Sequence, residues 1–90
     1  MLTKFLEQVI QAGGNALEIE YRDGKEWVTA FRGPVGVGIG CLTPDEAKPL
    51  FKEMASLRKN SRITLSGKTH RLHVAGRESF GELVYRIEIR

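Results

Sequence analysis

The sequence has little cysteine and no long apolar run, and each shortage excludes a class of protein. Its one cysteine among 90 residues, Cys41, rules out an internal disulfide and favours a reducing compartment. No stretch approaches the ~20 apolar residues of a membrane span, and the first residues lack the apolar core of a signal peptide. We therefore expect a cytoplasmic protein without membrane insertion.

Length and charge set further limits. Ninety residues predict a single domain over residues 1–90. The net charge of +3 is uneven, because residues 1–57 carry −2 (six Lys/Arg, eight Asp/Glu) and residues 58–90 carry +5 (eight Lys/Arg, three Asp/Glu). A basic region can attract an acidic partner. These cations are not clustered, however, so a solvated sheet face is the preferred interpretation.

The first half of the chain predicts a helix and three strands. Apolar residues from Leu2 to Ile10 recur at helical spacing, with Thr3 as a candidate cap and Gly13-Gly14 as the stop. Alternating apolar residues predict strands, and Asp23-Gly24 predicts a hairpin turn. We place these strands at residues 17–22, 25–32 and 35–41.

The alternation of side chains along these strands decides which of them we assign to the core. Trp27 and Phe31 fall on a predicted apolar face, and Cys41 is in phase with valines of the third strand, so all three are expected in the core. Glycine occupies every second position of that strand, which leaves one face bare. Two interpretations remain open: the domain's own helix or loop covers Gly36, Gly38 and Gly40, or a ligand or partner does.

The second half predicts another helix and three more strands. Thr43-Pro44-Asp45-Glu46 has the form of a capping box with proline at the first helical position. Because Pro49 would interrupt that helix, we expect a separate turn at residues 43–47 and a main helix that begins near Lys48. Strands are predicted at residues 62–65, 69–75 and 82–90, with a longer connection that begins at Gly76.

The order of elements, α-βββ-α-βββ, indicates the fold class. Two three-stranded meanders, each preceded by a helix, pack most simply as one sheet with the helices together. We therefore predict an α+β fold with a mainly antiparallel six-stranded sheet and two helices packed on one face.

Several fragments of chemistry are present, and none is complete. Ser66-Gly67-Lys68-Thr69 resembles the end of a P-loop, but the first glycine of that motif is replaced by Arg62 and the segment joins two strands. His70 and His73 are an odd number apart in a strand, so they point to opposite faces and cannot share a metal. We expect no enzymatic activity, no metal and no cofactor.

Two segments carry a family resemblance. Residues 13–20 (GGNALEIE) and 81–87 (GELVYRI) resemble the N-terminal domain that precedes the motor in ATPases of type II secretion and type IV pilus machines. Ala16 and Glu18 stand where that family has Asp and His in its G-A-S-D-I-H-I-E stretch, and these 90 residues do not include an ATPase domain. The resemblance implies a PAS-like fold and a docking or regulatory role without ATP hydrolysis.

The leading hypothesis is a non-enzymatic protein-interaction or regulatory module, associated with a secretion or pilus system. Six polar residues on one predicted sheet face, here called the polar face, are the candidate contacts: Glu18, Glu20, Arg71, His73, Arg86 and Arg90. Cross-strand pairing with Arg86 or Arg90 would be a sufficient structural reason for Glu18 and Glu20. An exposed edge strand could also pair with a partner's strand or form a homodimer.

Two alternatives remain. One is nucleic-acid binding through the basic residues of the second half: Arg58, Lys59, Arg62, Lys68, Arg71 and Arg77. The other is a small-ligand sensor with a pocket between the sheet and the second helix, which a cavity of ~300 Å³ or more would favour.

Overall fold

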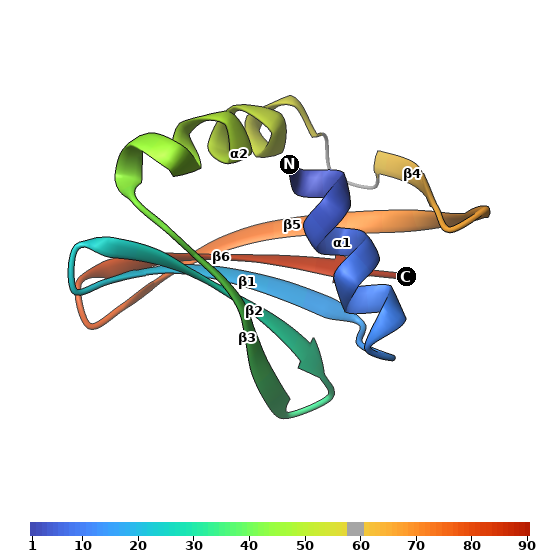
Figure 1. The fold of residues 1–90 in the computed structure, drawn as a ribbon, viewed down its shortest axis with the longest axis horizontal. Coiled ribbons are helices and arrows are strands. Elements are labelled where there is room, and N and C mark those ends of the chain that lie inside the picture. Colours follow the sequence, from blue (N-terminus) through green and yellow to red (C-terminus); the bar gives the residue numbers. More distant parts are fainter. Residues whose placement is uncertain (58–60) are drawn as a thin grey trace.

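The computed structural model describes residues 1–57 and 61–90 as one sheet with two helices. The elements are α1 (Leu2–Gln11), β1 (Ala16–Arg22), β2 (Lys25–Arg32), β3 (Val35–Leu42), α2 (Pro44–Ser56), β4 (Ser61–Leu65), β5 (Lys68–Ser79) and β6 (Glu82–Ile89). Both helices lie on the same face of the sheet (Figure 1), here called the helix face, and the opposite side is the open face. The predicted α+β class and the predicted order of elements are confirmed.

The sheet consists of two meanders that meet in the middle. Its six strands follow the order β3-β2-β1-β6-β5-β4, and every neighbouring pair is antiparallel. The first strand therefore pairs with the last, with Leu17 opposite Ile87 and Glu18 opposite Arg86. Strands β3 and β4 form the two edges of the sheet.

The core lies between the helix face and the two helices. Leu6 and Val9 of α1 and Leu50 of α2 have no exposed surface, and they pack against buried strand residues. Those strand residues include Leu17, Ile19, Val28, Leu65, Leu72 and Ile87. Burial of one such side chain contributes about 1.5–3 kcal/mol, so this layer holds the helices on the sheet. Within the described residues, neither helix is long and apolar enough to cross a membrane.

Helix α1 ends as predicted but begins differently. Gly13 adopts a left-handed φ of 74°, and the N–H groups of Gly13 and Gly14 donate to the carbonyls of Ile10 and Val9 at 3.0 and 2.8 Å. This is the Schellman arrangement that glycine permits. At the other end Met1 occupies the cap position, so the expected cap at Thr3 is wrong. The Glu53 carboxylate of α2 instead accepts the Leu2 N–H at 2.7 Å.

Helix α2 is continuous, so the expected separate turn before Lys48 is wrong. The capping box is confirmed: the Glu46 N–H donates to Thr43 Oγ1 at 3.2 Å, and the Thr43 N–H donates to the Glu46 carboxylate at 2.9 Å. These hydrogen bonds lower the pKa of Glu46. Ala47 and Leu50, on either side of Pro49, are fully buried. Their packing and the cap hold the helix together through the proline.

A β-bulge in β3 corrects the predicted phase of that strand. Val28 lies opposite Gly40 and Thr29 lies opposite Gly38, which leaves Ile39 as the extra residue. The bulge shifts Cys41 to the open face, where its side chain is exposed. The prediction of a buried Cys41 is therefore wrong, because strict alternation does not survive a bulge.

The three glycines of β3 have three different surroundings. A Cβ atom at Gly40 would lie 2.9 Å from the Phe5 ring of α1, so the domain's own helix covers it. A Cβ atom at Gly36 would lie 2.9 Å from the Phe31 ring, whereas one at Gly38 would meet no atom within 4 Å. Because of the bulge the three glycines do not share one bare face: Gly40 lies on the helix face under α1, whereas Gly36 and Gly38 lie on the open face, covered at Gly36 and uncovered at Gly38.

The aromatic residues of β2 lie on the open face, contrary to prediction. Glu26, Val28 and Ala30 occupy the helix face and are buried, which turns Trp27 and Phe31 outward into half-buried positions. Guanidinium groups cover both rings: that of Arg22 lies 5.2 Å from the Trp27 centroid, and that of Arg86 lies 5.2 Å from the Phe31 centroid. Such stacking lets an aromatic ring remain outside the core.

Strand β5 is longer than predicted. It extends to Ser79 and pairs with β6 up to Glu82, so the expected connection after Gly76 is wrong. The turn is the pair Phe80-Gly81, with φ values of 53° and 80°. Positive φ at both central residues is the mark of a type I′ hairpin turn.

Candidate interaction surfaces

The register places all six residues of the polar face on the open face of the sheet. Glu18 lies directly opposite Arg86, and His73 lies opposite Glu88. Arg71 and Arg90 exchange two main-chain hydrogen bonds of 3.0 and 2.8 Å, so their side chains share a face. The sequence pattern thus brings these residues together across three adjacent strands.

Many charges of this face are paired within the molecule. Glu18 is only 9% exposed and binds two guanidinium groups, those of Arg86 and, at 3.4 Å, Arg77. Glu18 thus has its cross-strand partner in Arg86, whereas Glu20 forms no ion pair with a described residue. Arg90 instead binds Glu88, two residues earlier in the chain, at 3.2 Å. These arginines are already engaged, which reduces the free charge they offer to a partner.

The incomplete motifs found in the sequence do not come together into a site. Ser66 and Gly67 form the turn between β4 and β5, with φ values of 51° and 80°, and no helix follows them. His70 lies opposite Ile63 on the helix face, whereas His73 lies on the open face. Residues 1–57 and 61–90 contain no group of three or more His, Cys, Asp or Glu side chains that could hold a metal ion.

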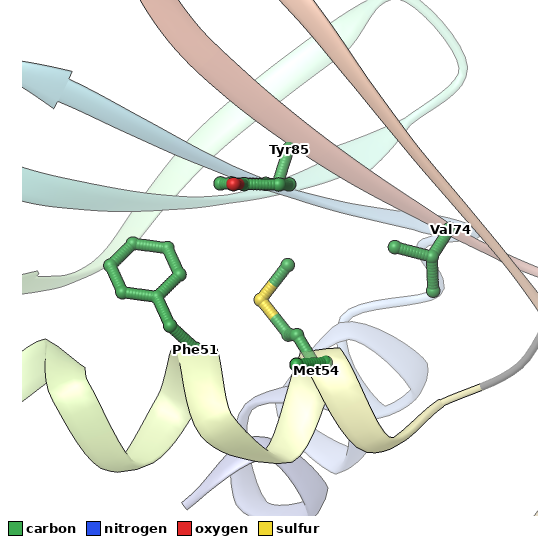
Figure 2. Close-up of a pocket in the computed structure, with 5 residues that line it drawn as sticks. Phe51, Met54, Val74 and Tyr85 are labelled. Atoms are coloured by element: carbon green, nitrogen blue, oxygen red, sulfur yellow. The ribbon is translucent and has the colours of Figure 1, made fainter.

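A small pocket lies under α2. Phe51 and Met54 of the helix point toward Tyr85 and Val74 of the sheet, as Figure 2 shows, and the two aromatic centroids are 5.6 Å apart. The pocket volume is about 120 Å³. Sites for small organic ligands usually measure ~300–1,000 Å³. The sensor alternative therefore gains no support from this pocket.

The edge strand β3 carries an exposed apolar surface. Its side chains Val35 and Val37 are 61% and 59% exposed, and no charged residue occurs between Val35 and Leu42. Beside them lies an open groove of about 260 Å³ between β3 and the end of α1. The groove is lined by Ala12, Gly14, Ala30, Phe31, Arg32, Val35, Val37 and Ile39. Val35, Val37 and this groove are together called the β3 surface.

Val35, Val37 and the groove were not among the predicted contact residues, although a partner at the glycines of β3 and pairing through an exposed edge strand were both left open. An uncharged run of eight residues was visible in the sequence, but its place at the edge of the sheet was not. An edge strand exposes backbone N–H and C=O groups, and natural proteins usually protect such edges with charges, proline or short length. Strand β3 has none of these three protections, although its bulge at Ile39 also disturbs edge pairing. Its regular part, residues 35–38, is therefore a candidate site for pairing with another chain.

Comparison with known proteins adds no assignment. No protein-family model matches the chain, and no curated protein matches it.

Proposed function

We propose that this chain is a non-enzymatic protein-interaction module whose principal contact is the β3 surface. One observation carries the proposal: an uncharged edge strand of eight residues exposes Val35 and Val37 next to an apolar groove. An isolated exposed valine is common on protein surfaces. An apolar groove beside an unprotected sheet edge is the arrangement that recognises an extended segment of another protein.

The β3 surface can supply both affinity and selectivity. A partner segment laid along β3 would form main-chain hydrogen bonds with the free edge of the strand. Its alternate side chains would point to the helix side, where the groove between Ala12 and Val37 accepts an apolar group. Arg32 at the groove would favour a carboxylate nearby, because it forms no ion pair with any described residue.

The polar face is the secondary contact in this proposal. Glu20, Arg71 and His73 form no ion pair with the described residues, and they remain available at the open face. The resemblance to the N-terminal domain of secretion and pilus ATPases supports a PAS-like fold and a docking or regulatory role in an assembly of that kind.

Nucleic-acid binding is the weaker candidate. Of the six cations predicted for it, Arg58 and Lys59 lie outside the described residues, and Lys68 falls on the opposite side of the sheet from Arg62 and Arg71. Arg77 is bound to Glu18. Single-stranded binders stack bases on accessible aromatic rings. Trp27 and Phe31 are covered by Arg22 and Arg86 instead. The exposed Phe80 ring lies between Glu78 and Glu82 in the sequence, and these carboxylates would repel a phosphate backbone.

The proposal is tested by selecting short displayed peptides that bind the whole chain. We expect binders that are extended and carry an apolar side chain with an acidic neighbour. The variant Val37→Lys should weaken their binding by roughly tenfold or more, since it places a charge at the groove. Thr64→Lys on the other edge strand is the matched control and should leave binding unchanged.

Two other outcomes would contradict the proposal. Peptides that ignore Val37→Lys but fail to bind Arg71→Glu would place the contact on the polar face. Binding of single-stranded oligonucleotides that falls steeply between ~50 and ~200 mM salt would favour the nucleic-acid function.

A further inference from the structure

Three hairpin turns of this chain share one backbone geometry but not one type of residue. Their φ values are 53° and 78° at Asp23-Gly24, 51° and 80° at Ser66-Gly67, and 53° and 80° at Phe80-Gly81. Small polar residues occupy the first position of two turns, as is usual at positive φ. The third turn has phenylalanine there, a bulky residue that seldom adopts this conformation.

The Phe80 side chain is unfavourable for this fold in two respects. Its backbone is in the left-handed region, and its ring is fully exposed, at 104% of the reference area. No ring contact involves Phe80 among the described residues, although Leu83 of the same hairpin is also 46% exposed. Strained residues that are kept despite such penalties concentrate at functional positions. The ring is thus placed for contact with another molecule.

The groove of the β3 surface has the size and lining to receive a phenyl ring. Its volume is about 260 Å³, and most of its lining is apolar. An apolar cavity of about 150 Å³ is sufficient to bind benzene. The pocket under α2, at about 120 Å³, is smaller than that.

Charges around the two features are complementary. Glu78 and Glu82 flank the Phe80 turn, and neither forms an ion pair with a described residue. Arg32, which is exposed, lines the groove and is also unpaired within the described part of the chain. A ring flanked by carboxylates therefore matches a groove that offers a guanidinium group.

The tip and the groove cannot meet within one molecule. Phe31 and Glu88 both lie opposite Ala16, at the groove end of the central strands. The Phe80 turn lies past Val84, which is opposite Glu20 at the other end. Figure 1 shows the β5–β6 and β2–β3 turns at different ends of the sheet.

We propose that the Phe80 tip of one molecule inserts into the groove of a second copy, with Arg32 facing Glu78 or Glu82. The inference rests on the proposed function, because the receiving surface is the β3 surface. The contact is head-to-tail, since tip and groove are different surfaces. A pair formed in this way keeps one free tip, on one copy, and one free groove, on the other, so association continues into chains or closes into a ring.

The test is sedimentation velocity of the whole chain over a concentration series. Wild-type protein should associate increasingly with concentration. Phe80→Ala lacks the tip and Val37→Lys lacks the groove, so each alone should associate roughly thirtyfold more weakly. Their equimolar mixture should form a dimer and nothing larger, because Phe80→Ala supplies a groove and Val37→Lys supplies a tip. Val35→Lys serves as a second groove variant if Val37→Lys fails to fold.

Two results would overturn the inference. One is wild-type protein that stays monomeric up to about 1 mM, because any association would then have a dissociation constant above about 1 mM. The other is a Phe80→Ala variant that associates as wild type does while Val37→Lys does not, which indicates symmetric pairing of two β3 strands. In either case peptide binding that is sensitive to Val37→Lys would still support the proposed function.

Discussion

The two edges of the sheet are built in opposite ways. Strand β4 is a short edge of five residues that carries Arg62 and anchors a fully buried Leu65 in the core. Strand β3 is an edge of eight residues without charge, and its Val35 and Val37 stay exposed. Short length and charge protect β4 from pairing with other chains. The lack of both at β3 is the difference on which the proposed contact through this edge rests.

The largest effect is expected from removing the anchor of β4. Leu65→Ala should lower the free energy of unfolding by about 2–5 kcal/mol, because it leaves a cavity in the core. The same truncation on the other edge, Val37→Ala, should change it by no more than about 0.5 kcal/mol, since that side chain is mostly exposed. Urea denaturation of the two variants measures both values. Equal losses would mean that β3 is packed as tightly as β4.

An intermediate effect is expected within β3 itself. Gly40→Ala forces a methyl group to within 2.9 Å of the Phe5 ring, so the ring must move and stability should fall by about 1–3 kcal/mol. Gly38→Ala adds a methyl group into open space and should leave stability unchanged or slightly raised. Thermal unfolding distinguishes them. If both variants are neutral, α1 does not rest on β3 as described.

The smallest effect concerns Glu26, which lies opposite Leu42 at the end of β3. Burial, and then the charge of Glu82, raise the pKa of Glu26 above its ordinary value of 4.5. The folded state therefore binds this proton more tightly than the unfolded state, and stability falls as pH rises through the raised pKa. Glu26→Gln removes this loss, so it should stabilise the protein at about pH 7 and have little effect near pH 4.

Unfolding midpoints at the two pH values check this expectation. Glu82→Gln is the control, because it removes only the second cause and should give a smaller shift in the same direction. A variant Glu26→Gln that is less stable at neutral pH would show that the carboxylate has a favourable partner.

Local signals predicted much of this fold because they act within a few residues. Gly13 ends α1, Asp23-Gly24 makes a hairpin, and Thr43 caps α2, each as its residue type requires. The phase of β1, which places Glu18 and Glu20 on the open face, also followed from alternation. Each of these inferences needed only neighbouring residues or a regular strand.

Features that depend on tertiary structure were not predictable. The bulge at Ile39 moved Cys41 to the open face, and no residue type in β3 marks that position. Burial of Leu50 keeps α2 intact across Pro49. The tight turn at Phe80-Gly81 was predicted as a longer connection from Gly76, because glycine often breaks a strand and phenylalanine is not a typical turn residue. The β3 surface required knowledge of the strand order, which alternation alone does not give.

The meeting of β1 and β6 at the centre of the sheet has a consequence for how the chain folds. Hairpins within each meander join residues close in sequence, so they can form quickly and independently. The Glu18–Arg86 bond, by contrast, joins residues 68 positions apart. Closing so long a loop is entropically costly until the contacts behind it form. Docking of the two meanders is therefore the expected rate-limiting step. Until it occurs, the backbone N–H and C=O groups on the facing edges of β1 and β6 are as unpaired as those on the free edge of β3.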